Sequence, residues 1–125
     1  ERPEDIPVLT ARLMNLGLPR GPRTGAAGGL GAKLLALGAN LVDGAGTVLE
    51  NLHFDQACQG CEAVVTGEGR LDASTLEGKL PAVVARRART LGLRVIGRFG
   101  CRGAGWREAS KLFDEVHFEV TDEAQ

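Results

Sequence analysis

The sequence predicts an α/β fold: a partial parallel sheet with flanking helices on both of its faces. Three observations lead to this expectation. Residues 63–65 form a short apolar run with the character of a buried strand, and residues 80–91 carry an apolar stripe at helical spacing. A second apolar strand follows at residues 93–97. A strand, a helix and a second strand in this order make a βαβ unit, so the two strands are expected to be parallel.

The segment before that unit is predicted to be largely helical. Apolar spacing indicates a helix over residues 6–16, with Asp5 as its N-cap, and a connector at 18–23 follows. The glycine-rich residues 24–32 lead into a helix at 33–37. Shorter elements are expected next: an extended piece at 41–42, a weak helix at 47–52 and a helical turn at 54–58.

After the second strand the pattern predicts three more pieces. Residues 100–105 are a glycine-rich loop, residues 106–112 a short helix, and residues 115–120 a strand with period-two alternation. Trp106 is expected to anchor the short helix by packing, and His117 to lie on an exposed face of the last strand.

Composition limits the function classes. The 125 residues contain 15 Lys and Arg against 16 Asp and Glu, a net charge of −1, so we expect neither a nucleic-acid partner nor a membrane partner. No run approaches the roughly 20 apolar residues that span a bilayer. Three cysteines cannot form a closed disulfide set and suit a reducing compartment, so a cytoplasmic location is expected.

Residues 66–79 are the candidate ligand site, predicted as a loop at the carboxyl end of the first strand. Ligands of parallel sheets bind at that end. Two glycines, Gly67 and Gly69, free the backbone, and the side chains that follow are charged or hydroxylic: Glu68, Arg70, Asp72, Ser74, Thr75 and Lys79. Lys79 is a cation at the N-terminus of the next helix, which is unfavourable because it opposes the helix dipole. An anionic ligand bound at the same end would make this position favourable. The alternative is a surface loop whose charges pair with one another.

Two other motifs are weaker. The glycines around Gly28 and Gly29 could cradle a phosphate, but close helix packing through small residues is the preferred interpretation. Cys58 and Cys61 form a CxxC without the further ligands that a structural zinc site needs, and it precedes the strand rather than following it as redox motifs do. These cysteines are interpreted as two small buried residues.

Three stretches resemble the bacterial glycerate kinase family. They are GAAGGLGAKLLAL at residues 25–37, VVTGEGRLDASTLEGKLPAVVARRAR at 64–89 and LRVIG at 93–97. The resemblance implies a fragment of a two-domain α/β kinase, in which residues 1–22 are a helix and connector from the preceding region. Residues 23–120 would be a C-terminal-half segment and 121–125 a truncated tail. Arg23, Thr24, Arg98 and Cys101 depart from the family pattern.

The resemblance also implies a reaction and a set of roles. The reaction is ATP-dependent phosphorylation of D-glycerate to 2-phosphoglycerate, with magnesium, and the isolated fragment is expected to be inactive. Catalytic roles fall on Glu68, Arg70, Asp72 and Lys79, with Glu68 and Asp72 as possible magnesium ligands. Substrate or phosphate contacts fall on Gly67, Gly69, Ser74, Thr75, Gly28 and Gly29.

Two alternatives stay open at this point. The chain could be a non-catalytic α/β module for binding or oligomerisation, or another nucleotide-binding protein that uses the same loop for phosphate. Unpaired strand edges would favour a homo-oligomer or other association in either case.

Overall fold

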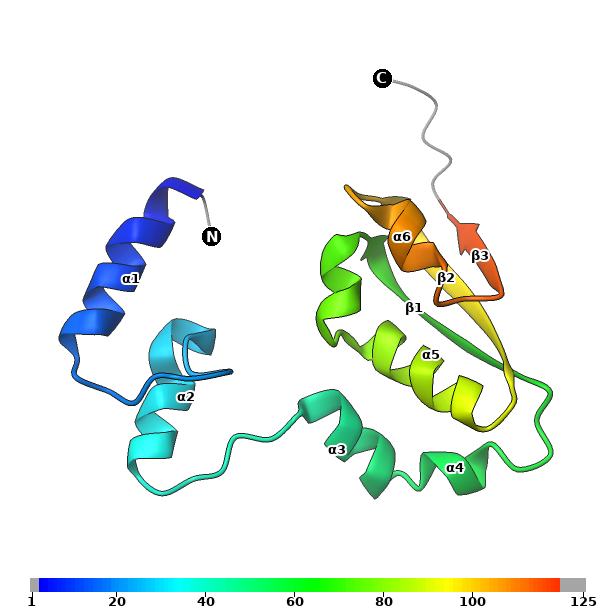
Figure 1. Cartoon of the computed structure of the whole chain (residues 1–125), viewed down its shortest axis with the longest axis horizontal. Helices are drawn as coiled ribbons and strands as arrows, with labels where there is room; N and C mark the ends of the chain where they lie inside the picture. The colour runs from blue at the N-terminus through cyan, green and yellow to red at the C-terminus, as the bar shows by residue number, and fades with distance from the viewer. Residues whose placement is uncertain (1–2, 120–125) are drawn as a thin grey trace. The chain divides into compact units, whose positions relative to one another are not determined.

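The computed structural model describes residues 3–119 and divides into two compact units, one within Glu1–Val42 and the other within Asp43–Gln125 (Figure 1). The predicted tail at 121–125 and the last residue of the predicted final strand, Val120, lie outside the described residues. The predicted division after residue 22 stays a prediction. Over residues 3–119, no helix has both the length and the apolar character needed to cross a membrane.

The first unit contains a 3₁₀ turn at Pro3–Asp5 and two helices, α1 (Ile6–Asn15) and α2 (Ala26–Ala36). The glycine-rich start of α2 is not regular helix, because residues 27–29 have positive φ angles of 50°, 66° and 91°. A Cβ atom at Gly29 would lie 2.3 Å from Leu13 Cδ2. Gly29 therefore permits close packing of α1 on α2, as the preferred interpretation of the glycine run expects.

The second unit holds the parallel sheet. Its elements are α3 (Gly44–Asn51), α4 (Phe54–Ala57), β1 (Ala63–Leu71), α5 (Leu80–Thr90), β2 (Arg94–Arg102), α6 (Trp106–Ser110) and β3 (Glu115–Phe118). The strand order is β1-β2-β3, and both neighbouring pairs are parallel. The predicted α/β class and the parallel βαβ unit are confirmed.

The strands are longer than the sequence predicts. The prediction that β1 ends at Val65 is wrong, because its pairing with β2 continues from Ala63–Arg94 to Leu71–Arg102. Residues 66–71 of the predicted site loop are therefore strand, and β2 takes in the first residues of the predicted loop at 100–105. The polar residues and glycines after Val65 end the apolar sequence pattern, but the backbone hydrogen bonds between β1 and β2 continue past them. Helix α3 begins earlier than predicted, since the Asp43 carboxylate accepts a hydrogen bond from the Gly46 N–H and caps it.

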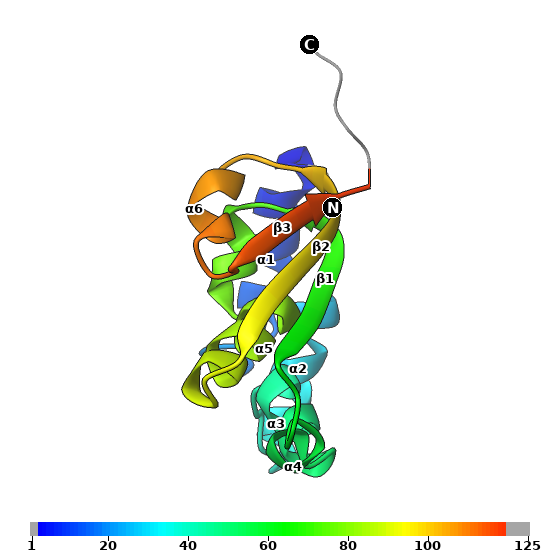
Figure 2. The ribbon, with the colours of Figure 1, turned by 90° about the vertical axis from the view of Figure 1, so that its right-hand side faces the viewer.

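Helices α5 and α6 lie on the same face of the sheet (Figure 2). Within the second unit the prediction of helices on both faces is wrong, because α5 and α6 share one face. Two right-handed crossovers that step in the same direction, from β1 to β2 and from β2 to β3, place both helices on one side. The other face is open: Val65 keeps 60% of its surface exposed, and Arg98 is exposed on the central strand. Exposure to water also satisfies the Arg98 guanidinium within the sheet.

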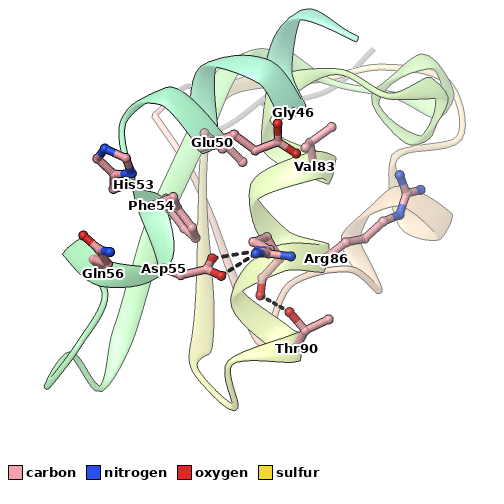
Figure 3. Close-up of a pocket in the computed structure, with 11 residues that line it drawn as sticks. Gly46, Glu50, His53, Phe54, Asp55, Gln56, Val83, Arg86 and Thr90 are labelled. Carbon is pink, nitrogen blue, oxygen red and sulfur yellow. Dashed lines mark hydrogen bonds and ion pairs between the residues drawn. The ribbon is translucent and has the colours of Figure 1, made fainter. Parts of the chain in front are cut away.

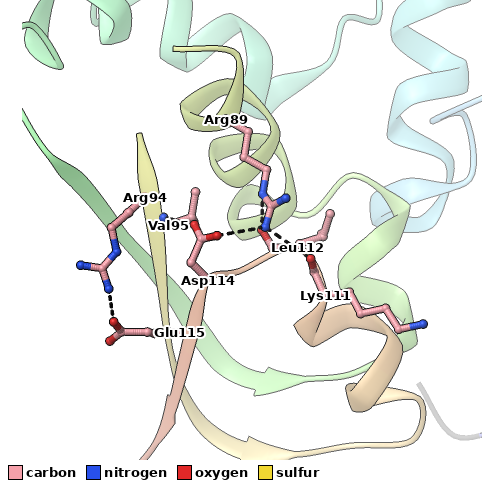
Figure 4. A network of polar contacts seen from close by, with 7 residues as sticks. All are labelled: Arg89, Arg94, Val95, Lys111, Leu112, Asp114 and Glu115. Carbon is pink, nitrogen blue, oxygen red and sulfur yellow. Dashed lines mark hydrogen bonds and ion pairs between the residues drawn. The ribbon is translucent and has the colours of Figure 1, made fainter. Parts of the chain in front are cut away.

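The core lies between the sheet and α5. Leu71, Val95 and Phe99 are almost fully buried, and the Phe99 and Phe113 rings meet edge to face with centroids 5.3 Å apart. A polar network ties the ends of these elements together (Figure 4). The Asp114 carboxylate accepts from the Val95 N–H at 2.7 Å, and Arg89 Nε donates to the Leu112 carbonyl at 3.1 Å. The start of β2, the end of α5 and the turn before β3 are thereby joined.

Gly67 and Gly69 form a matched pair that tests the strand packing. A Cβ at Gly67 would lie 1.8 Å from the Arg98 carbonyl oxygen, whereas a Cβ at Gly69 meets nothing within 4 Å. We expect Gly67→Ala to lower the free energy of unfolding by about 1–3 kcal/mol because β1 and β2 must separate. Gly69→Ala should change it by less than about 0.5 kcal/mol. Urea unfolding of the two variants measures the difference, and equal values would contradict the close approach.

Candidate functional site

The candidate site lies where β1 ends and turns back toward α5. Asp72 follows the strand and caps a 3₁₀ turn, Ala73–Glu77, with its carboxylate oxygen Oδ1 accepting from the Ser74 N–H at 2.9 Å. The Ser74 hydroxyl donates to the same oxygen. Lys79 is the N-cap of α5. The short spacing between the strand end and the helix start therefore brings all of these side chains to one corner.

Thr75 connects the turn to the strand. Its side chain is fully buried, with 0% exposed, and its hydroxyl donates to Glu68 Oε1 at 2.7 Å. The same hydroxyl oxygen accepts from the Asp72 N–H at 3.3 Å. A threonine hydroxyl has one proton to donate, and in Thr75 that proton is used in the hydrogen bond to Glu68. Thr75 thus holds Glu68 in position and is closed off from solvent.

Lys79 lies between two carboxylates. Its Nζ is 3.6 Å from Glu68 Oε2 and 3.7 Å from Asp72 Oδ1, and its side chain keeps 41% of its surface exposed. The two negative charges offset the unfavourable position of a cation at the N-terminus of α5. At these distances the ammonium group can still turn a donor toward an incoming anion.

The pKa of the Asp72 carboxyl is lowered from its ordinary value. The largest cause is the hydrogen bond from the Ser74 hydroxyl, followed by the charge of Lys79, the Ser74 N–H and the charge of Arg70. The pKa of Arg70 is raised, chiefly by a hydrogen bond with Cys101, its register partner on β2. Asp72 is therefore held in its charged form beside two cations.

The loop after β2 completes the corner, which the sequence did not predict. Gly103 N–H donates to the Leu71 carbonyl at 2.8 Å, and Ala73 N–H donates to the Ala104 carbonyl at 2.9 Å. A Cβ at Gly103 would lie 2.7 Å from Asp72 Cβ and 2.9 Å from Arg70 Cδ. The loop can lie this close because glycine leaves the space. The sequence Gly-Ala-Gly at residues 103–105 indicates a close backbone approach, but it does not indicate which segment lies against it.

The structure thus gathers most of the predicted site residues. Six side chains belong to the corner between β1 and α5: Glu68, Arg70, Asp72, Ser74, Thr75 and Lys79. Gly67 and Gly69 lie within β1, next to them in sequence. Gly28 and Gly29 belong to the first unit, and the corner belongs to the second.

The two carboxylates near Lys79 are the candidate magnesium ligands. Within residues 3–119, no group of three or more His, Cys, Asp or Glu side chains is arranged to hold a metal ion. Mg²⁺ commonly uses one or two protein carboxylates and takes its other ligands from water and substrate phosphates. Glu68 and Asp72 fit that kind of site and do not make a metal cage by themselves.

A separate cavity of about 560 Å³ lies between α3, α4 and the later turns of α5 (Figure 3). Phe54 and Val83 contribute apolar surface, and His53, Glu50 and Arg86 add polar groups. Arg87 Nε donates to Asp55 Oδ1 at 2.7 Å, which joins α5 to α4 along one side. Arg86 and Arg87 are both exposed, and Arg87 is also paired across the fold with Asp55.

The remaining predictions for single residues have mixed outcomes. His117 is exposed on β3, and Trp106 packs edge to face on Phe118 with centroids 5.5 Å apart, so both expectations are confirmed. The interpretation of the CxxC cysteines as buried residues is wrong. Cys58 is half-buried and Cys61 is exposed. They follow a four-residue helix that ends before the core begins.

Comparison with known proteins identifies relatives of this arrangement. The model of the Glycerate kinase family matches residues 6–125. A glycerate kinase from Halalkalibacterium halodurans is 44% identical over 86 residues, 68% of this chain and 23% of the relative. The glycerate 2-kinase of Escherichia coli K12 is 44% identical over 80 residues, 63% of this chain and 21% of the relative.

A solved structure agrees with these relatives. A crystal structure from Salmonella typhimurium LT2, assigned as a glycerate kinase 2, superposes with a TM-score of 0.55 at 39% identity. The match covers 75% of this chain and 24% of the solved one. The chain accordingly spans about a quarter or less of the length of the relatives named here.

Thr75 and Thr90 provide a matched test of the buried hydroxyl. Thr75→Val leaves Glu68 Oε1 and the Asp72 N–H without a partner, so we expect the free energy of unfolding to fall by about 1–3 kcal/mol. Thr90 is exposed and its hydroxyl donates to the Arg87 carbonyl in the same helix, so Thr90→Val should cost less than about 0.5 kcal/mol. Urea unfolding measures both. Similar losses in the two variants would argue against the link from Thr75 to Glu68.

The lowered pKa of Asp72 predicts an acid-dependent contribution to stability. A carboxyl whose folded pKa is depressed stabilises the fold above its unfolded pKa of about 3.9, and the contribution is lost as pH falls through the lower folded value. The difference in urea midpoint between the wild type and Asp72→Asn should therefore be constant near pH 6 and shrink below about pH 4. Parallel curves down to pH 2 would contradict this account.

Proposed function

Because this chain belongs to the glycerate kinase family, we propose that it is part of an enzyme that transfers a phosphoryl group from ATP to D-glycerate, forming 2-phosphoglycerate. The observation that carries the proposal is the corner at the carboxyl end of β1, where Lys79 lies between Glu68 and Asp72. Ligands of parallel sheets bind at this end, and phosphoryl transfer depends mainly on positioning and on neutralising charge.

Lys79 and Arg70 are the proposed anion-binding groups. Lys79 is partly exposed, and its contacts with the two carboxylates are longer than ordinary hydrogen bonds, so a phosphate or carboxylate oxygen can compete for its donors. Arg70 is exposed and permanently charged, and its planar guanidinium can bind two oxygens of one anion. Together they offset the negative charge that a nucleotide and glycerate bring.

Glu68 and Asp72 are the proposed magnesium ligands or hydroxyl-orienting groups. A bound Mg²⁺ would supply charge neutralisation to phosphate oxygens. The hydrogen bond from Thr75 fixes Glu68, and the two bonds from Ser74 fix Asp72, so both carboxylates are held before ligand arrives. We assign Thr75 a positioning role because it is buried. Ser74 remains the proposed phosphate contact.

The glycines have separate proposed roles. Gly67 is explained by the approach of β1 to β2, whereas Gly69 faces open space and leaves room for a ligand beside the backbone. Gly29 is explained by packing against Leu13, and Gly28 faces open space. Gly69 and Gly28 therefore remain the candidates for phosphate contacts.

We propose that the 125-residue chain does not turn over substrate by itself and acts in the cytoplasm as part of a longer product. It spans only 20–26% of several relatives. Apolar side chains such as Leu37 and Val65 are 73% and 60% exposed, which favours association through uncovered surfaces. The same exposure supports the second candidate, a non-catalytic module for binding or oligomerisation.

An assay of ADP release separates the two candidates. It is run with ATP, Mg²⁺ and D-glycerate on the 125-residue chain and on the full-length gene product that contains it. Turnover by the full-length product alone is the expected result. Absence of turnover in that product, with specific ligand binding retained, would favour the non-catalytic module.

Lys79 and Lys111 provide a matched pair for the active product. Lys79→Met should lower kcat/KM by about 10²-fold or more, because a charge at the reacting phosphate is lost. Lys111 is exposed on the turn after α6 and pairs with Glu108, so Lys111→Met should leave kcat/KM within about twofold. If the two variants lose activity equally, Lys79 is not part of the site.

A further inference from the structure

The turn at residues 58–61, here named the dithiol turn, connects α4 to β1. Cys61 N–H donates to the Cys58 carbonyl at 3.1 Å, and Gly60 within the turn has a φ of 76°, which glycine adopts without strain. A hydrogen-bonded turn of four residues holds its first and last Cα atoms within about 7 Å. Disulfides join Cα atoms about 4.4–6.8 Å apart, so the turn sets the two cysteines at a bridging separation.

The Cys61 thiol lies beside the start of the dithiol turn. Cys61 Sγ lies 3.8 Å from the carbonyl oxygen of Ala57, the residue immediately before Cys58, so the thiol folds back over the end of α4. Cys61 is exposed and Cys58 is half-buried, which leaves Cys61 open to a reagent and Cys58 close behind it. Cys101 lies elsewhere, on β2 beside Arg70.

We propose that the dithiol turn is a redox modification site, at which Cys58 and Cys61 close to an intramolecular disulfide by exchange with a small disulfide of the glutathione class. The Cys61 thiolate attacks one sulfur of glutathione disulfide, and one glutathione leaves as the mixed disulfide forms. The Cys58 thiolate then attacks Cys61 sulfur, and the second glutathione leaves. Two electrons pass to the glutathione disulfide, and the two cysteine protons end on the two glutathione thiols.

The surroundings favour the closed form. Burial raises the pKa of the Cys58 thiol, and the nearby Cys61 and Asp55 raise it further. A dithiol whose thiolates are stabilised is easily kept reduced, whereas one that lacks this stabilisation holds its disulfide more firmly. The pairing also accounts for both cysteines without a metal, since no site with three such ligands occurs over residues 3–119.

Closure would act on the helix that borders the cavity. Helix α4 ends directly before Cys58 and carries Asp55, which pairs with Arg87 of α5. A disulfide across the dithiol turn would restrict the backbone segment that links α4 to β1. The bridge therefore fixes α4 from its C-terminal side while Arg87 holds it from α5.

Equilibration of the full 125-residue chain in glutathione redox buffers tests the proposal. After an acid quench and alkylation, peptide mass spectrometry should find a single conversion that removes two hydrogens between Cys58 and Cys61 and leaves Cys101 alkylated. The equilibrium constant in buffer should exceed that of the same chain in urea by about tenfold or more, which corresponds to about 30 mV. Cys58→Ser and Cys61→Ser serve as matched controls and should accumulate only a glutathione adduct on the remaining cysteine.

Three results would overturn the proposal. The wild type could carry glutathione on both cysteines without closing, the bridge could instead involve Cys101 or a second chain, or the folded chain could close no more readily than the unfolded one. Each result is independent of whether a longer product has kinase activity.

Discussion

The close approach of β1 to β2 is the constraint on which the second unit depends. Gly67 packs against the Arg98 carbonyl where any side chain would collide, and the ladder then continues to Leu71. Because β1 stays in the sheet to that point, Glu68 is held by the strand and meets the buried hydroxyl of Thr75. The corner that brings the carboxylates to Lys79 is thus a consequence of strand packing.

The parallel topology could be predicted from the sequence, but the ends of the strands could not. Apolar runs and the helix between them identify the βαβ unit, and Pro81 and Gly92 mark the limits of α5 as predicted. The polar residues Glu68 and Arg70 look like loop in a single sequence because their hydrogen-bonding partners come from β2, far along the chain. The burial of Thr75 and the approach of the loop at Gly103 depend on tertiary packing in the same way.

The two interpretations of the charged segment prove compatible. The sequence allowed either an anion site or a set of charges that pair with one another. In the structure the charges do pair: Lys79 contacts both Glu68 and Asp72, and Asp72 also accepts a hydrogen bond from the Ser74 N–H. Because Glu68 and Asp72 offset the charge of Lys79, the lysine can lie at the start of α5 even when no ligand is bound. The cluster of residues at this corner also holds both carboxylates in place and lowers the pKa of Asp72, which suits a site that would receive magnesium and phosphate.

Hydrogen exchange with mass spectrometry tests the central claim most directly, on the full-length gene product with and without D-glycerate and a non-hydrolysable ATP analogue. The account predicts ligand-dependent protection of the backbone amides at residues 68–79 and 103–105, the two segments that build the corner. Protection confined to α3, α4 and the later turns of α5, around the 560 Å³ cavity, would place the ligand elsewhere and contradict the account.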